Sequence, residues 1–279
     1  IVLEDNGKEL FRKRIPTEQS RGYENIVERI SGLYREMTDA IDGAEHTFGI
    51  GTPGAISPDT GLLSLSNTVC MNGKPLKADI EKSIGRSIEL QNDANCFAMA
   101  EAIMGAGKGK ETVFGVILGS GCGGGIVNRG KVVTGLNLRS GEWGHMSIDP
   151  NGPECFCGRR GCVETYISGG GMENRYRDRY GEERSFRSIE SDYREGEKRA
   201  VEMMEAFFVN FGRAMANLIT VLDPDIIVIG GGVSKFEDIY TRGVEQVKKR
   251  ILGDQLKTPV VQHEIGDSAG VIGAALIGI

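Results

Sequence analysis

Apolar residues recur along the chain with two different spacings, and these spacings predict where helices and strands lie. Apolar residues three or four positions apart are typical of helices, whereas short apolar or alternating runs between turn residues are typical of strands. The predicted helices cover residues 22–42, 76–84, 94–104, 197–222 and 268–278. The predicted strands cover residues 46–50, 62–65, 88–92, 112–118, 125–127, 131–133 and 225–229, with an edge strand near Val260. Because helices and strands alternate, with hairpins inserted, the predicted fold class is α/β.

Turn residues and glycines mark the connections between these elements. The opening segment predicts a hairpin with its turn at Asn6-Gly7, and residues 105–110 (GAGKGK) are the best candidate for a linker or domain boundary. Glycine accounts for 41 of the 279 residues, roughly double the usual share of about 7%. Clusters of glycine occur at 49–54, 119–125, 168–172 and 229–233. Glycine clusters between apolar runs predict tight turns where the backbone approaches another group closely.

Charge and hydropathy argue against two kinds of partner. The net charge is −6 and the sequence pI is about 5.3, which argues against a nucleic-acid surface. The charged stretch 173–199 mixes both signs, which predicts a solvated helical surface rather than a binding patch. No apolar run approaches the roughly 18 residues that a membrane span needs. We therefore expect a cytoplasmic enzyme, with neither nucleic acid nor membrane as a partner.

Three of the six cysteines lie within eight residues and predict a metal site rather than disulfides. Cys155, Cys157 and Cys162 have the spacing C-x-C-x4-C, and His145 lies ten residues before the first of them. Three thiolates and one imidazole complete a tetrahedral zinc shell of the structural kind, which leaves no open position for a substrate. The alternative is a set of buried free cysteines beside an unrelated histidine. Zinc is the favoured interpretation.

Asn92 and Asp93 lie where a predicted strand ends and a predicted helix begins. Ligands of α/β proteins collect at the carboxyl ends of strands, and the amides and dipole of the helix would hold a carboxylate ionised there. Asp93 is therefore a candidate base for a substrate hydroxyl; the alternative is that it only caps the helix. Asn92 favours a polyol site, because its amide both donates and accepts. Glu142 and Glu164 would add acceptors for sugar hydroxyls, or are simply exposed charges.

Two glycine turns are candidates for nucleotide binding. Gly119, Ser120 and Gly121 follow an apolar strand, and such a turn presents backbone N–H groups and a hydroxyl to phosphate oxygens. The turn is neither a Walker loop nor a Rossmann fingerprint. Gly231 and Gly232 follow another strand and would let a base or ribose lie flat on the backbone. Each turn alone is an ordinary connection, but together with the polar cluster they favour a nucleotide site.

Six stretches give the chain a resemblance to the ROK family (repressors, uncharacterised reading frames and sugar kinases) over nearly its whole length. They are GTPGAISPDTG (51–61), QNDANCFAMAEA (91–102), ILGSGCGGGIV (117–127), SGEWGH (140–145), CFCGRRGCVET (155–165) and DPDIIVIGGGVS (223–234). The combination of GExGH with CxCGxxGCxE is highly specific to this family.

The resemblance implies an actin-like (ribonuclease H-like) two-domain ATPase fold with nucleotide and sugar in the interdomain cleft. A small domain would comprise residues 1–107 and 266–279, and a large domain with the zinc-binding loop would comprise residues 108–265. Asp93 matches the family's base for the primary hydroxyl of the sugar, and His145 would contact both zinc and sugar. The positions that match family sugar contacts or lie near the sugar are Gly54, Asn92, Asp93, Glu142, His145 and Glu164. ATP with Mg²⁺, a structural Zn²⁺ and a homodimer are also implied.

The family's first strand carries an Asp-x-Gly-Gly-Thr phosphate motif immediately before the hairpin with which this sequence begins. A chain that truly started at Ile1 would lack a phosphate-binding turn and a central strand, and would be expected to have little or no activity. We expect the motif to precede Ile1 in the full protein, because every other matching stretch is intact.

The identity of the sugar rests on finer resemblances. The runs GTPGAISPDTGLLSLSNT and NGKPL, with GEWGH, look most like bacterial fructokinase and mannokinase members, so ATP-dependent phosphorylation of the 6-hydroxyl of fructose or mannose is favoured. N-acetylglucosamine kinases share similar runs and are the alternative, followed by glucokinases; a few kcal/mol decides among such substrates. A different class is a sugar-sensing transcriptional regulator of the same family. Its helix-turn-helix would show as two short helices with a basic face, a pattern not seen before residue 20.

Overall fold

Alternating side chains build the central sheet of this computed structural model, which describes residues 1–253 and 255–278. In β7 (Thr112–Leu118), Phe114 and Val116 pack on one side of the sheet and Val113 on the other. The other strands are β8 (Cys122–Asn128), β9 (Lys131–Val132), β10 (Ile226–Gly230) and β11 (Val260–Gln262). Their order is β11-β10-β7-β8-β9; the first three are parallel, and β8 and β9 are antiparallel to their neighbours.

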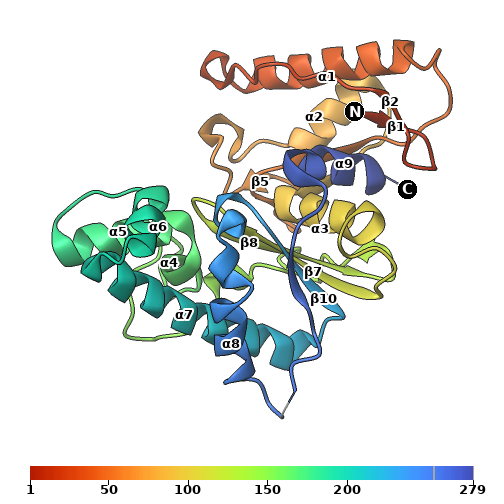
Figure 1. Cartoon of the computed structure of the whole chain (residues 1–279). Coiled ribbons are helices and arrows are strands. Elements are labelled where there is room, and N and C mark those ends of the chain that lie inside the picture. Colours follow the sequence, from red (N-terminus) through yellow and green to blue (C-terminus); the bar gives the residue numbers. More distant parts are fainter. Residues whose placement is uncertain (254, 279) are drawn as a thin grey trace.

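Helices cover both sides of this sheet (Figure 1). One side packs against α7 (Lys198–Leu222) and α8 (Arg242–Lys248), which share a core of buried phenylalanines with the sheet. The other side packs against α3 (Asp93–Met104) and the last helix, α9 (Ala269–Leu276). A sheet with helices on both faces is the layered arrangement that the α/β pattern of the sequence predicts.

Glycines let α3 lie directly against its neighbours. A Cβ on Gly115 of β7 would lie 2.7 Å from the Cβ of Ala98, and a Cβ on Gly273 of α9 would lie 1.7 Å from the carbonyl oxygen of Cys96. Neither position can hold a side chain while α3 stays where it is. The close packing of α3 on the sheet and on α9 therefore accounts for part of the high glycine content.

The N-terminal elements form a second group beyond α3 and α9 (Figure 1). They are β1 (Val2–Leu3), β2 (Glu9–Phe11), α1 (Tyr23–Asp39), β3 (Gly49–Thr52), β4 (Ala55–Ile56), β5 (Leu63–Ser64), α2 (Leu76–Ile84) and β6 (Glu89–Asn92). β1 and β2 form the predicted hairpin, with Gly7 at a φ of 85° in its turn. β3 and β6 are parallel, and β4 and β5 are antiparallel. These elements have a core of their own around Ile26, Leu76 and Ile80.

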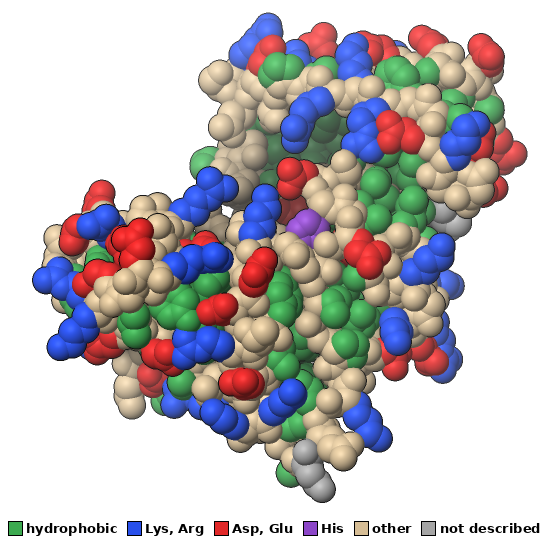
Figure 2. All heavy atoms as spheres, viewed as in Figure 1, with side chains coloured by type: hydrophobic (Ala, Val, Ile, Leu, Met, Phe, Trp, Pro, Cys, Tyr) green, Lys and Arg blue, Asp and Glu red, His purple; other side chains and the backbone are tan. Residues whose placement is uncertain are grey.

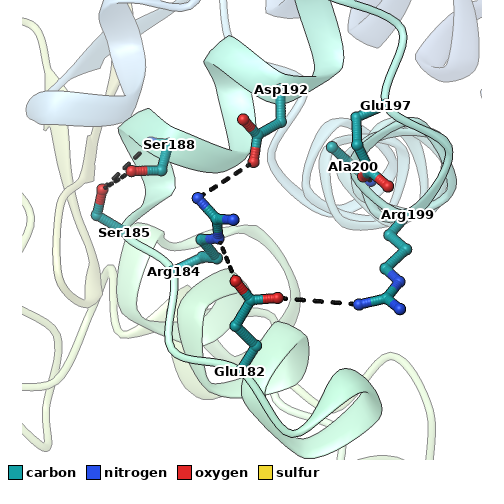
Figure 3. A network of polar contacts seen from close by, with 8 residues as sticks. All are labelled: Glu182, Arg184, Ser185, Ser188, Asp192, Glu197, Arg199 and Ala200. Atoms are coloured by element: carbon teal, nitrogen blue, oxygen red, sulfur yellow. Dashed lines mark hydrogen bonds and ion pairs between the residues drawn. The ribbon is translucent and has the colours of Figure 1, made fainter.

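The charged stretch 173–199 forms helical surface, as predicted. The helices of this region are α4 (Glu164–Ile167), α5 (Gly169–Tyr180) and α6 (Phe186–Arg194). Figure 3 shows Arg184 between Glu182, 2.8 Å away, and Asp192, 3.8 Å away. The carboxylate of Glu197 caps α7 by accepting the backbone N–H three residues on, at 2.7 Å. Exposed ion pairs each contribute little stability, so this network mainly solvates and orients the helices.

Most predicted elements are present, with ends shifted by a few residues. The clearest correction concerns the glycine run 119–125, because only residues 119–121 form the turn and residues 122–125 already belong to β8. These strand glycines pack against α3 and Trp143, so they belong to the sheet rather than to the loop. The last helix packs against α3 and β3 and thus returns to the N-terminal elements. The domain boundaries at 107/108 and 265/266 stay a prediction.

The surface carries both signs of charge. Figure 2 shows Lys and Arg side chains interspersed with Asp and Glu over the face in view. Among the described helices, none combines the length and the apolar character needed to cross a membrane.

Candidate active site

The carboxyl ends of two parallel strands bring the two predicted nucleotide turns together. Gly230 at the end of β10 lies opposite Ile117 in β7, so the turns 119–121 and 231–232 leave the same edge of the sheet. Gly231 has a φ of 86°, and a Cβ there would lie 2.3 Å from the carbonyl oxygen of Leu118. Only glycine fits at this position, because the backbone of the turn 231–232 touches the backbone at the end of β7.

Both predicted glutamates lie in segments that pack against the start of β8. Glu164, the first residue of α4, accepts a hydrogen bond from the backbone N–H of Cys122 through Oε2, at 3.0 Å. Burial, followed by the charges of Glu164 and Glu142, raises the pKa of the Cys122 thiol well above its ordinary value. The segment of Glu142 also lies against this strand, because a Cβ on Gly124 would lie 2.8 Å from the carbonyl oxygen of Gly141, and the side chain of Glu142 is exposed to solvent. Glu164 is therefore bound to the start of β8, and a sugar-binding role for Glu142 stays a prediction.

The same strand positions the segment with His145 and the helix with Asp93. Trp143 donates from Nε1 to the carbonyl oxygen of Gly123 at 3.0 Å, which holds the short helix η3 (Trp143–His145) against β8. A Cβ on Gly123 would lie 3.3 Å from the Cβ of Ala94, the residue after Asp93. Asp93, Glu142, His145 and Glu164, which are far apart in sequence, are therefore gathered around residues 122–124.

Asn92 caps α3 and joins it to the loop at Gly54. Its Oδ1 accepts the backbone N–H of Ala94 at 2.8 Å, and its Nδ2 donates to the carbonyl oxygen of Gly54 at 3.0 Å. A Cβ on Gly54 would lie 2.4 Å from the carbonyl oxygen of Ser64, so the glycine is required by close packing as well as by its φ of 88°. The alternative that Asp93 is the N-cap is thus wrong: Asn92 takes that position, and Asp93 is the first residue of the helix.

The helix is not the only influence on the charge of Asp93. Asp93 remains accessible to solvent, but the protein around it desolvates the carboxylate and raises its pKa. The hydrogen bond from the backbone N–H of Ala94, 2.8 Å long, opposes this effect and is the weaker of the two. A raised pKa brings a carboxylate closer to the range in which it exchanges protons near neutral pH.

The four predicted metal ligands lie in one cluster, and their ligand atoms are all within 4.8 Å of one another. The Sγ atoms of Cys157 and Cys162 are 3.6 Å apart, and Sγ of Cys155 is 3.6 Å from Nδ1 of His145. Tetrahedral zinc with Zn–S bonds of about 2.3 Å separates two sulfurs by about 3.8 Å. The donor set and its spacing therefore fit a structural zinc ion. Oε1 of Glu164 lies 3.8 Å from Sγ of Cys155, which places this cluster beside the converging carboxylates.

The turn 119–121 rests on the start of α5. The backbone N–H of Gly169 donates to the carbonyl oxygen of Gly119 at 2.7 Å, and that of Gly170 donates to the carbonyl oxygen of Ser120 at 3.2 Å. Ser168, which is completely buried, caps α5 by accepting the N–H of Gly171 at 2.9 Å. This contact between the turn and α5 was not predicted, although a serine before three glycines (168–171) is the pattern from which it could have been inferred.

Two cavities open beside these residues. A groove of about 730 Å³ is lined by residues that include Ser120, Gly121, Phe156, Glu164 and Arg175. A second cavity of about 460 Å³ lies between the β1–β2 hairpin, α1, β3 and α9 and reaches Asp93. Glu164 thus lines the groove and Asp93 lines the second cavity, both of which a ligand can enter.

Comparisons with known proteins identify the class. The model of the ROK family matches residues 1–278. The curated N-acetyl-D-glucosamine kinase of Vibrio cholerae is 39% identical, over 96% of this chain and 93% of its own length. The chain therefore belongs to the ROK family. Curated relatives from Vibrio atlanticus and Pectobacterium atrosepticum, 38% and 36% identical, have the same name.

Solved structures confirm the actin-like fold. The ROK hexokinase from Thermus thermophilus has a TM-score of 0.86 and 28% identity, over 95% of this chain and 88% of that chain. The ROK family glucokinase from Streptomyces griseus, in complex with glucose and AMPPNP, has a TM-score of 0.76 and 26% identity, over 99% of this chain and 94% of that chain. Because the curated relatives are named N-acetyl-D-glucosamine kinases, the predicted preference for fructose or mannose is not supported, and the alternative sugar gains weight.

Proposed function

This ROK family member is an ATP-dependent sugar kinase, and we propose that it transfers a phosphoryl group to the 6-hydroxyl of N-acetyl-D-glucosamine. The observation that carries the proposal is that Glu164, the segment with His145 and the helix that begins with Asp93 all contact residues 122–124 of β8, next to the turn 119–121. A sugar needs several acceptors and donors that fix its hydroxyls, and phosphoryl transfer needs a base beside a phosphate-binding turn. The names of the curated relatives favour N-acetyl-D-glucosamine as the sugar.

Asp93 is the proposed base. The carboxylate would accept the proton of the sugar hydroxyl as that oxygen attacks the transferred phosphorus. Its position supports this role, because it starts α3, stays accessible to solvent and has a raised pKa. Asn92 holds this end of the helix by capping it and by its hydrogen bond to Gly54. Asn92 and Gly54 are therefore proposed to lie beside the sugar.

The turns at the sheet edge are the proposed nucleotide site. The backbone N–H of Gly121 and the hydroxyl of Ser120 would bind phosphate oxygens of ATP, while the N–H of Gly119 closes the turn by donating to the carbonyl oxygen of Gly121 at 3.0 Å. Gly231 and Gly232 on the neighbouring strand would hold the rest of the nucleotide. Mg²⁺ would accompany the phosphates, as phosphoryl transfer from ATP requires.

Zinc is proposed at Cys155, Cys157, Cys162 and His145 as a structural ion. Because Nδ1 of His145 faces the sulfur of Cys155, Nε2 is the nitrogen that would meet a sugar hydroxyl. The metal would then orient the imidazole for the substrate. A single ion would in this way hold η3 and the start of α4, which carry His145 and Glu164, in one arrangement.

A panel of sugars tests the substrate. Release of ADP is measured with N-acetyl-D-glucosamine, glucose, mannose and fructose, on protein whose N-terminus has been determined. The proposal expects the highest kcat/KM with N-acetyl-D-glucosamine. A higher kcat/KM with another sugar would reassign the substrate within the family, and sugar binding without ADP release would favour a sugar-sensing regulator. The proposed homodimer and cytoplasmic location are tested separately, by light scattering and cell fractionation.

A further inference from the structure

Glu101 is unusual among the described residues because its charged side chain is completely buried, with 0% of its surface exposed. It lies on the last turn of α3, the helix that begins with Asp93. Glutamate is almost never fully buried unless partners replace its water. The side chain must therefore have a compensating set of hydrogen bonds, and their location indicates its role.

The partners are backbone N–H groups from two segments that are distant in sequence. Oε2 of Glu101 accepts from Ala106 at 3.0 Å and from Glu264 at 3.2 Å, and Oε1 accepts from Ile265 at 2.9 Å. Residue 106 lies on the connection from α3 to β7, and residues 264–265 lie on the connection from β11 to α9. One carboxylate thus joins both connections to the end of α3.

The first connection is built around this carboxylate. A Cβ on Gly105 would lie 2.2 Å from Oε2 of Glu101 and 3.0 Å from Cγ1 of Ile265. The backbone N–H groups of Gly105 and Gly107 also donate to the carbonyl oxygen of Glu101, at 3.2 and 2.9 Å. No side chain at residue 105 fits between the carboxylate and the two connections. The end of α3 and the two connections therefore move together unless these contacts break.

These connections coincide with the predicted domain boundaries at 107/108 and 265/266. Both connections join the sheet to α3 and α9, the helices that lie between the sheet and the N-terminal elements, so they hold these helices in place when the N-terminal elements close on the sheet. Asp93 lies eight residues from Glu101 along α3, which corresponds to about 12 Å. A rigid helix transmits the position of its last turn to its first residue.

We propose that Glu101 is a positioning residue, the pivot that fixes α3 to both connections so that Asp93 keeps its place beside the phosphate turn when the N-terminal elements close on the sheet. The inference rests on the proposed kinase function and on the predicted domain division. Glu101 touches neither sugar nor nucleotide in this account and acts only through the path of the backbone. Loss of the pivot should therefore impair closure and turnover more than sugar binding.

The test compares Glu101→Gln, which keeps the size but replaces one acceptor by a donor, with Asn210→Ala, which removes a buried polar side chain from α7. Sugar binding is read from the fluorescence of Trp143, the single tryptophan, closure from small-angle scattering with and without sugar, and stability from thermal unfolding. We expect Glu101→Gln to lower kcat roughly ten- to a hundredfold, to reduce the compaction by sugar, and to bind sugar nearly as the unchanged protein does. Asn210→Ala should lower only stability.

Each outcome decides the proposal. A Glu101→Gln protein that loses stability but keeps kcat and compaction would show a purely structural role and overturn the pivot. Equal losses of kcat in both variants would do the same. Absence of sugar-driven compaction in the unchanged protein would also overturn it, whatever the activity. The proposed function fails separately, if the unchanged protein releases no ADP with any sugar.

Discussion

Replacing Gly121 by alanine should weaken sugar binding by displacing Glu164. A Cβ at Gly121 would lie 2.7 Å from Oε2 of Glu164, whereas ordinary contacts begin at 3.4 Å, so the carboxylate must move by about 0.7 Å (3.4 − 2.7). Oε2 lies 3.0 Å from the backbone nitrogen of Cys122, and this movement would stretch that distance to at most about 3.7 Å, beyond the usual limit of about 3.2 Å. Gly121 does not have a positive φ, so alanine meets no backbone strain.

The size of the effect follows from this hydrogen bond. A hydrogen bond to a charged group contributes about 1.5–3 kcal/mol, and about 1.4 kcal/mol corresponds to a factor of ten in an equilibrium constant. If Glu164 binds a sugar hydroxyl in the orientation that Cys122 fixes, the KM for sugar should rise roughly ten- to a hundredfold. The turnover number should fall less, because Asp93 and the phosphate turn keep their positions.

Gly119→Ala is the matched control, two residues away in the same turn. A Cβ there would meet no atom within 4 Å, so Glu164 should stay in place. The open space at Gly119 is where phosphates would approach, so this variant should raise the KM for ATP rather than for sugar. Initial rates with one substrate varied and the other saturating separate the two effects. An unchanged sugar KM in Gly121→Ala, or an equal rise in both variants, would refute the role given to Glu164.

Three further predictions follow from the same geometry. Cys157→Ser should release zinc and lower the unfolding temperature by about 5 °C or more, while Cys70→Ser, outside the cluster, should change neither; unchanged metal content in Cys157→Ser would exclude the zinc site. Asn92→Ala removes a helix cap worth about 1 kcal/mol and should lower the unfolding temperature by about 2–4 °C and raise the KM for sugar; calorimetry and rates check this. The raised pKa of Asp93 places the acid limb of kcat/KM above the ordinary aspartate range near 4. Because the pKa of Asp93 is higher in the folded state than in the unfolded state, its protonation stabilises the fold. This stabilisation is fully present below the unfolded-state pKa and is lost as pH rises through the folded-state pKa. Asp93→Asn should therefore be at least as stable as the unchanged protein near pH 7.5, with a smaller advantage near pH 3; the opposite trend would contradict the shift.

Local patterns predicted most of the fold. Helical spacing located α1, α2, α3, α7 and α9, and the apolar run 112–118 coincides with β7. The metal cluster could also be predicted, because its ligand types and their spacing are a chemical signal within a short stretch. Helix caps were harder to assign: adjacent Asn92 and Asp93 both suit an N-cap, and only the backbone path shows that Asn92 takes it.

Contacts between distant segments could not be read from the sequence without the family resemblance. The packing of the segments of Glu142 and Glu164 against β8 depends on the pairing of β7 with β8 and on the contact of η3 with that hairpin. The raised pKa of Asp93 depends on how much protein surrounds it, which no local pattern specifies. Glu101 reads as an ordinary charge on a helix until both connections are seen to meet at it.

The role of Asp93 as the base is tested by measuring both turnover and sugar binding in one variant. Asp93→Asn is compared with Asp39→Asn, an exposed aspartate at the end of α1, by release of ADP with N-acetyl-D-glucosamine and by Trp143 fluorescence. We predict that Asp93→Asn loses roughly 10²- to 10⁴-fold in kcat while its fluorescence still responds to the sugar, and that Asp39→Asn behaves as the unchanged protein. Turnover by Asp93→Asn close to that of the unchanged protein would contradict the assignment of the base. No sugar-dependent ADP from the unchanged protein would contradict the kinase itself.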